Sequence, residues 1–130
     1  QDTHITTRLI LAATAALALM GTAATAKTLA TANSDIGTVV TSAKNGLTLY
    51  TFRNDVKNQS NCYGDCANAW PPFTASASAK ADGALGVIKR KDGSRQWTLN
   101  GQPLYFWAGY QARGDATVDG VGGVWDAVRN

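Results

Sequence analysis

Two cysteines, one aspartate and a set of large aromatic residues have types and spacing that could do chemistry in this chain. Cys62 and Cys66 are the only cysteines. Cysteines four residues apart on a helical turn lie within disulfide range, whereas redox-active dithiols generally use C-x-x-C, a spacing associated with a lowered thiol pKa. The pair therefore favours a structural disulfide, and a redox dithiol is the alternative.

Residues 1–26 have the pattern of a secretory signal peptide. The apolar run Leu9–Met20 is too short to span a bilayer and is followed by the small-x-small cleavage pattern Ala24-Thr25-Ala26. No cysteine directly follows this run to accept a lipid. We expect an exported mature chain, periplasmic or extracellular, that starts at Lys27 and has no stable membrane insertion. Its compartment would be oxidising, which also favours a disulfide.

Removal of this leader would take away His4, the only histidine, and the chain has no glutamate. Nucleophilic triads need an imidazole base, and catalytic zinc and most copper sites need imidazole, thioether or free thiolate ligands. Asp55 is placed to accept hydrogen bonds from backbone N–H groups of the loop that follows it, and no partner acid or base is apparent. We therefore expect a protein that is not an enzyme, with no catalytic residue, metal or cofactor.

The positive charge of the chain is weak and spread out, with a formal net charge of +3. Its only cluster is Lys89-Arg90-Lys91. Because nucleic-acid-binding proteins carry a denser basic stripe, we expect no nucleic acid partner. A weak attraction to anionic polymers of the cell envelope is compatible with this charge.

The second half of the chain repeats the first at an offset of 55 residues. The matching pairs are Asn45/Asn100, Gly46/Gly101, Leu49/Leu104, Tyr50/Tyr105, Phe52/Trp107 and Trp70/Trp125. Such a period predicts two copies of one structural unit. We expect a flexible arm over residues 27–35 and then a single domain over 36–130, made of repeats at about 36–80 and 81–130.

Short alternating or β-branched runs between turn dipeptides predict about six strands. They fall at residues 36–43, 47–52, 85–90, 94–99, 104–107 and 124–128. Asn-Gly pairs predict two-residue hairpin turns in which both residues have positive φ. One short helix is expected near the cysteines, ended by Pro71-Pro72. The predicted fold class is all-β, a small antiparallel sandwich or a partly open barrel.

Most of the large aromatic side chains are expected in the core, because aromatic rings bury large areas. Side chains alternate along a strand, so Phe106 should point away from Tyr105 and Trp107. We take Phe106 and Tyr110 as a candidate binding surface. An exposed aromatic strip there would bind sugar rings or a partner protein.

Five ordered motifs together resemble the bacterial "secreted repeat of unknown function", a family of predicted lipoproteins with a Y-x-[FWY]-x-x-D motif. The motifs lie at residues 49–55, 61–72, 90–94, 100–105 and 120–125. The resemblance implies that Tyr50, Phe52 and Asp55 form the full motif and that Tyr105 and Trp107 belong to a second copy. That copy is broken, because Tyr110 stands at the aspartate position. Membrane anchoring is not carried over, since the lipid-accepting cysteine is absent.

These observations predict an exported, non-enzymatic β domain that binds a component of the cell envelope, either a glycan or a protein. The alternative is a redox or electron-transfer accessory protein that acts through Cys62 and Cys66 or through the aromatic cluster.

Overall fold

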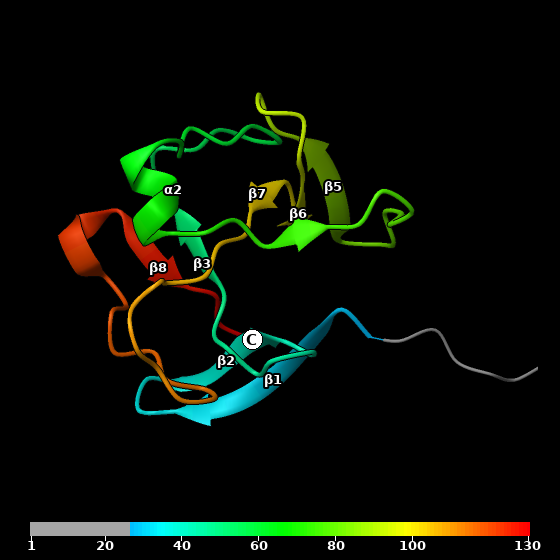
Figure 1. The fold of residues 1–130 in the computed structure, drawn as a ribbon. Helices are drawn as coiled ribbons and strands as arrows, with labels where there is room; N and C mark the ends of the chain where they lie inside the picture. The colour runs from blue at the N-terminus through cyan, green and yellow to red at the C-terminus, as the bar shows by residue number, and fades with distance from the viewer. Residues whose placement is uncertain (1–26) are drawn as a thin grey trace, which may run out of the picture.

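The fold is described here from a computed structural model, which describes residues 27–130. The predicted signal peptide, residues 1–26, lies outside this part of the chain. The described chain contains eight strands, one α-helix and one 3₁₀ helix, and every strand pairing is antiparallel (Figure 1). In chain order the elements are β1 (Leu29–Ser34), β2 (Gly37–Ser42), β3 (Tyr50–Phe52), α2 (Asp65–Ala69), β4 (Thr74–Ala75), β5 (Leu85–Lys89), β6 (Arg95–Leu99), β7 (Gln102–Pro103), η1 (Val121–Gly123) and β8 (Trp125–Ala127). The structure therefore confirms the all-β class, with a short helix beside the cysteines.

The two halves of the chain are intertwined. In the first half β1 pairs with β2, and in the second half β5 and β7 both pair with β6. The third pairing crosses between the halves, because β3 pairs with β8. Figure 1 shows β3 and β8 side by side between the β1–β2 hairpin and the sheet of β5, β6 and β7. Neither half can therefore complete its own set of strands.

A local two-fold axis passes between two equivalent tyrosines. The Tyr50 N–H donates to the Tyr105 carbonyl at 2.8 Å, and the Tyr105 N–H donates to the Tyr50 carbonyl at 2.9 Å. Backbone hydrogen bonds farther out repeat at the same offset of 55 residues. The matching bonds are Arg53 N to Val124 O with Ala108 N to Ala69 O, and Val128 N to Leu49 O with Phe73 N to Leu104 O. The predicted repeat is thus an internal pseudo-symmetry of the fold.

The two Asn-Gly turns differ, and the prediction for the first one is wrong in detail. Asn100 and Gly101 have φ of 53° and 82°, and Leu99 pairs with Gln102 across them, as a two-residue turn requires. At residues 45–46 only the glycine has positive φ, and the loop closes between Ser42 N and Leu47 O at 3.0 Å. The Asn45 side chain accepts a hydrogen bond from Leu47 N at 2.9 Å, which stabilises this longer loop.

Each of these two turns is crossed by a loop from the other half of the chain. The Asn58 N–H donates to the Gly101 carbonyl at 2.7 Å, and a Cβ atom on Gly101 would lie 2.7 Å from the Lys57 side chain. Likewise the Gly114 N–H donates to the Gly46 carbonyl at 3.0 Å, and Arg113 covers Gly46. Both glycines are therefore needed for close approach as well as for their backbone angles.

Side-chain alternation separates the core into two clusters. Tyr50, Tyr105, Trp70 and Trp125 belong to the larger cluster, and partly buried Phe52 and Trp107 pack against it. The smaller cluster contains Val40, Leu49 and Leu104, with Phe73, Trp97 and Phe106 among the partly buried residues around it. Phe106 thus packs on the opposite side from Tyr105 and Trp107, as its place in the strand predicted.

The predicted flexible arm over residues 27–35 is wrong for most of its length. Leu29–Ser34 forms β1 and pairs with β2 over all six residues, from Leu29 opposite Ser42 to Ser34 opposite Gly37. The segment consists mostly of small and polar residues and carries no local strand signal. Its conformation comes from pairing with β2 and from packing of Leu29 against the smaller core cluster.

Candidate functional site

The aspartate of the family motif binds the tyrosine of the opposite repeat. Tyr105 donates its hydroxyl hydrogen to Asp55 Oδ2 at 2.6 Å, and Asn61 N donates to Asp55 Oδ1 at 2.7 Å. Ser60 Oγ lies 2.6 Å from the Tyr105 hydroxyl oxygen. Since the tyrosine hydrogen is already given to Asp55, Ser60 is the donor in this contact. We call Asp55, Ser60 and Tyr105 the Tyr–Asp clasp.

A buried arginine extends the Tyr–Asp clasp. Arg90 is 3% exposed, and its Nη1 donates to Ser60 Oγ at 2.9 Å and to Gln96 Oε1 at 2.7 Å. Its Nη2 donates to the Cys62 carbonyl at 2.7 Å, and the guanidinium carbon lies 4.4 Å from the centre of the Tyr63 ring. Ser60 and Tyr105 therefore link the buried positive charge of Arg90 to the carboxylate of Asp55, which offsets the cost of burying either charge alone.

Burial sets the pKa values in this region. It raises the pKa of Asp55 above its usual value, although the hydrogen bonds from Tyr105 and Asn61 and the charge of Arg90 act in the opposite direction. Burial also raises the pKa of Tyr105, and the bond to Asp55 adds to this rise. The clasp hydroxyl is therefore a fixed hydrogen-bond donor at neutral pH. Tyr105 is fully buried, so the hydroxyl does not face solvent.

The equivalent clasp is missing in the other half of the molecule. Tyr50 is fully buried, and its hydroxyl has no hydrogen-bond partner within the described residues. Burial and then the charge of Asp119 raise its pKa to about 12, while the nearby Val118 backbone lowers it without completing a hydrogen bond. Tyr110, which replaces the motif aspartate, is 94% exposed. The broken second motif is thus visible as an unpaired buried hydroxyl.

Alkaline pH should unfold this protein through these two tyrosines. The pKa of Tyr50 is about 12 and that of Tyr105 is also raised, against an ordinary value of 10.0. Their contribution to stability is therefore complete below pH 10 and is lost as the pH rises through about 12. We expect tyrosinate absorbance from Tyr50 and Tyr105 to appear together with loss of the far-ultraviolet circular dichroism. Ionisation of all 4 tyrosines near pH 10 in a folded protein would contradict this.

The remaining motif aromatics build the centre of the larger core cluster. Phe52 stacks on Trp125 with ring centres 4.3 Å apart, and Trp125 stacks on Trp70 at 4.0 Å. The two tryptophans also meet the tyrosines of their own repeats edge-on, Trp70 with Tyr50 at 5.2 Å and Trp125 with Tyr105 at 5.1 Å. The ring of Trp107 lies over Gly109, where a Cβ atom would clash with it. These residues hold the repeats together and do not form an accessible site.

The cysteine pair is a disulfide, as predicted. Cys62 and Cys66 are bonded, their Cα atoms lie 5.2 Å apart, and the structure has no free cysteine within residues 27–130. Cys62 is fully buried beside the backbone carbonyl that Arg90 binds. The disulfide therefore braces the start of α2 against the Tyr–Asp clasp.

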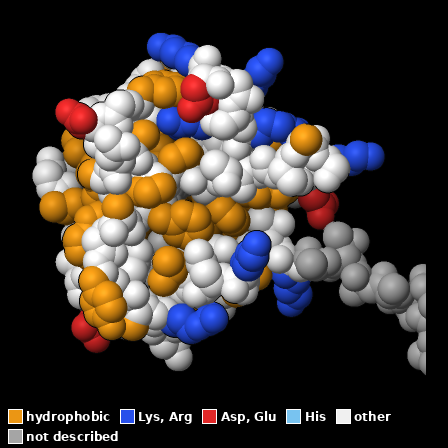
Figure 2. Space-filling view, in the orientation of Figure 1, with side chains coloured by type: hydrophobic (Ala, Val, Ile, Leu, Met, Phe, Trp, Pro, Cys, Tyr) orange, Lys and Arg blue, Asp and Glu red, His pale blue; other side chains and the backbone are white. Residues whose placement is uncertain are grey.

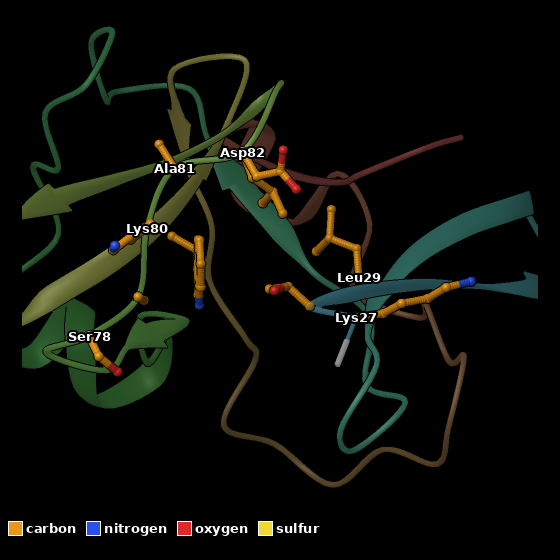
Figure 3. A pocket seen from close by; sticks show the side chains of 10 residues that line it. Lys27, Leu29, Ser78, Lys80, Ala81 and Asp82 are labelled. Atoms are coloured by element: carbon orange, nitrogen blue, oxygen red, sulfur yellow. The ribbon is translucent and has the colours of Figure 1, made fainter. Parts of the chain in front are cut away.

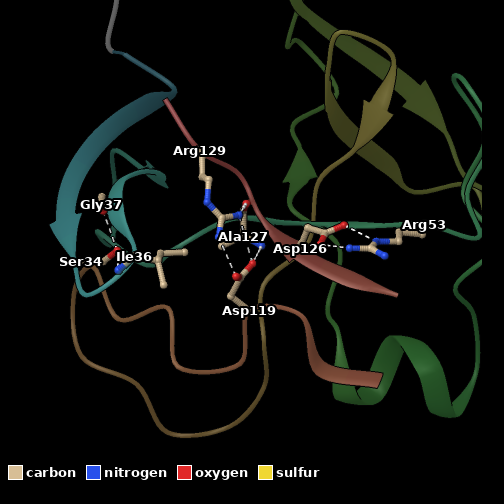
Figure 4. Close-up of polar contacts among 8 residues, drawn as sticks. All are labelled: Ser34, Ile36, Gly37, Arg53, Asp119, Asp126, Ala127 and Arg129. Carbon is tan, nitrogen blue, oxygen red and sulfur yellow. Dashed lines mark hydrogen bonds and ion pairs between the residues drawn. The ribbon is translucent and has the colours of Figure 1, made fainter. Parts of the chain in front are cut away.

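Two ion pairs flank β8, on opposite sides of the strand (Figure 4). Arg53 binds Asp126 and Arg129 binds Asp119, each with a nitrogen–oxygen distance of 2.8 Å. Asp119 also accepts a hydrogen bond from Ala127 N at 2.8 Å. Because the arginine side chains are more than half or half exposed, at 59% and 50%, each pair contributes little to stability. No group of three or more metal-ligating side chains is arranged around an ion site in the described part of the chain.

An open groove runs past Trp97 on the surface. Its larger hollow, about 690 Å³, lies between the start of β1 and the loop before β5, and Leu29, Leu85 and Trp97 line it. A second hollow of about 350 Å³ shares Lys27, Thr28 and Trp97 with the first and is also lined by Phe73 and Phe106. We call the two hollows together the Trp97 groove. Figure 2 shows hydrophobic side chains across the middle of this face, with lysine and arginine side chains around them.

Sequence reasoning identified only part of this groove. Phe106 lines it, as the candidate binding surface requires, whereas Tyr110 lies outside both hollows. Trp97 and Phe73 were not singled out, although both are large aromatics on short strands or beside one. Their rings are 6.4 Å apart and Phe73 meets Phe106 at 5.2 Å, so the three form a row. The separation of these residues in the sequence hides the row.

Comparison with known proteins supports the repeat architecture. Neither the curated proteins nor the solved structures give a significant match. Within residues 27–130, no helix is long and apolar enough to cross a membrane. The family model described as "secreted repeat of unknown function" matches twice, over residues 30–74 and 86–129. The first match begins at residue 30, within β1, and not at the predicted residue 36. With both copies matched over most of its length, the chain belongs to this family of secreted repeats.

Proposed function

We propose that this exported β domain binds a glycan of the cell envelope in the Trp97 groove and has no catalytic step. Binding sites for small molecules and extended chains are concave and mainly apolar, with a few polar groups that fix orientation. The Trp97 groove has this character. Its aromatic row is bordered by the polar side chains of Thr28, Ser42, Asn45 and Thr74.

The internal pseudo-symmetry carries this proposal. Trp97 N donates to Phe73 O at 2.9 Å, and the matching bond in the other half joins Val40 N to Val128 O at 2.8 Å. Trp97 and Phe73 therefore correspond to Val40 and Val128. By the 55-residue offset, Phe106 corresponds to Thr51. Since the same backbone is built elsewhere with two valines and a threonine, the fold itself does not need an aromatic row, and binding gives a reason for one.

A glycan fits this row better than the redox alternative fits the disulfide. Partly exposed aromatic rings offer large rigid faces with little loss of conformational entropy on binding, and sugar rings present flat apolar faces to them. A redox dithiol needs an accessible sulfur, whereas Cys62 is fully buried. The Tyr–Asp clasp also offers no exposed acid or base at Tyr105. These observations favour a binding protein over a redox protein or an enzyme.

The test is binding of the secreted protein to polysaccharide fractions of the envelope, followed by intrinsic tryptophan fluorescence. We expect Trp97→Leu and Phe106→Leu to weaken binding at least about tenfold, because loss of one stacked ring costs about 1–3 kcal/mol in comparable stacking sites. Leucine keeps an apolar side chain at each position, and circular dichroism checks that the variants are folded.

Tyr110→Ala is the matched control, since Tyr110 is an exposed aromatic outside the Trp97 groove. Its binding should equal that of the parent protein. The proposal fails if no polysaccharide fraction binds, or if the groove variants bind as tightly as the control. Retention only by a protease-sensitive partner would assign the groove to a protein instead.

A further inference from the structure

We infer that the glycan bound in the Trp97 groove is an acidic polysaccharide whose carboxylates meet Lys27, Lys44 and Lys80. This inference rests on the proposed function, because it names the chemical class of ligand for the same groove. It follows from how charge is distributed around the two hollows.

The three lysines are spread along the full length of the groove. Lys80 lines the larger hollow, Lys44 the smaller one, and Lys27 lines both. Figure 3 shows Lys27 and Lys80 on opposite sides of the larger hollow, with their amino groups at its outer edge. Long lysine side chains commonly lay their methylene groups against apolar surface and keep the amino group in water. A ligand seated on the aromatic row would therefore pass within reach of successive positive charges.

These positive charges are not neutralised by the described part of the protein. Asp82 is the only acidic residue that lines either hollow. The ion pairs within residues 27–130 join Arg53 to Asp126 and Arg129 to Asp119, so none involves a groove lysine. Uncompensated charges of one sign beside a low-dielectric wall raise the local concentration of ligands of the opposite sign.

The other hollows do not share this combination. The hollow beside Arg113 is lined by Asp35, Asp115 and Asp119. The hollow beside Asp55 contains Arg53 and Lys57 but only one aromatic ring, that of Phe52. An aromatic row and an excess of positive charge occur together only in the Trp97 groove among the hollows of the described chain described above. A uronic acid unit matches both features, because its ring can stack while its equatorial carboxylate accepts charge-assisted hydrogen bonds.

The experiment compares each acidic oligosaccharide with its own methyl ester, which keeps the sugar ring and the linkage and removes the charge. The probes are oligogalacturonate, oligomannuronate and their fully methyl-esterified forms. We expect the acid to bind about tenfold more tightly than its ester at low ionic strength, since several exposed ion pairs add modest contributions. The difference should vanish near 1 M salt, where the Debye length is about 3 Å.

The triple variant Lys27→Gln, Lys44→Gln, Lys80→Gln should bind acid and ester equally. Lys57→Gln, Lys89→Gln, Lys91→Gln is the matched control, because it removes the same charge outside the groove. It should keep the preference for the acid. Equal binding of acid and ester by the parent protein, lost in Trp97→Leu, overturns the charge inference and leaves the proposed function standing. Binding of neither acid nor ester overturns this inference, and failure with every envelope fraction overturns the proposed function as well.

Discussion

Trp125→Ala should leave the protein largely unfolded or sharply lower its melting temperature. Trp125 is 5% exposed, stacks on Phe52 and Trp70, and meets Tyr105 edge-on. Truncation of a buried tryptophan to alanine costs about 3–5 kcal/mol, through lost burial and the cavity that is left. The total stability of a small domain is only about 5–15 kcal/mol. The expected loss is thus a large share of the total.

Phe106→Ala is the comparison for this prediction, because Phe106 lies on the opposite side of its strand and lines the Trp97 groove. Thermal melts followed by circular dichroism should show a much smaller decrease for Phe106→Ala, together with weaker glycan binding. If Trp125→Ala melts like the parent protein and instead loses a binding partner, Trp125 belongs to a surface site and its assignment to the core is wrong.

The stacked tryptophans also explain why the repeats are found together in one chain. Trp70 and Trp125 occupy equivalent positions, and their rings stack at 4.0 Å across the pseudo-symmetric centre. Each also contacts the tyrosine of its own repeat, while the backbone beside it pairs with the other repeat. A single copy would expose one face of this stack and leave strand edges unpaired. We therefore regard the two copies as one cooperative unit.

The repeat, the helix and most strands could be predicted because their signals are local. The Asn-Gly dipeptide at residues 100–101 determines a turn within two residues, and alternation places Phe106 opposite Tyr105 within the same strand. Pro71-Pro72 ends α2 in the same local way. A one-dimensional pattern contains each of these signals in full.

The partners of these elements could not be predicted, because partner choice is a property of the whole fold. Nothing near Tyr50 indicates that its backbone pairs with Tyr105, or that Asp55 reaches a hydroxyl 50 residues away. β1 shows the same limit, since its small residues become a strand only through pairing with β2. The Trp97 groove was found only in part for this reason. Its lysines and rings come from separate elements, and Phe106 as a binding residue stays a prediction.

Tyr105→Phe should destabilise the protein by about 2–3 kcal/mol, the range for loss of a hydrogen bond to a charged group. The variant keeps the ring in the core and removes only the hydroxyl. Asp55 would lose its 2.6 Å donor, and Ser60 would lose the acceptor that lies 2.6 Å away. Arg90 would then share a partly dissolved network with a carboxylate that is no longer linked to it. Urea unfolding, with the midpoint and slope measured separately, gives the free-energy change.

Tyr50→Phe is the matched control that the pseudo-symmetry provides. Tyr50 is as fully buried as Tyr105, but its hydroxyl has no partner within the described residues. Removal of an unsatisfied buried hydroxyl is neutral or stabilising in principle, so the change should stay within about 1 kcal/mol of the parent protein. The two variants delete the same atom from equivalent positions, and only the aspartate of the opposite repeat distinguishes them. Equal destabilisation by both would show that Asp55 adds nothing to the clasp and that burial of the tyrosine ring is its whole contribution.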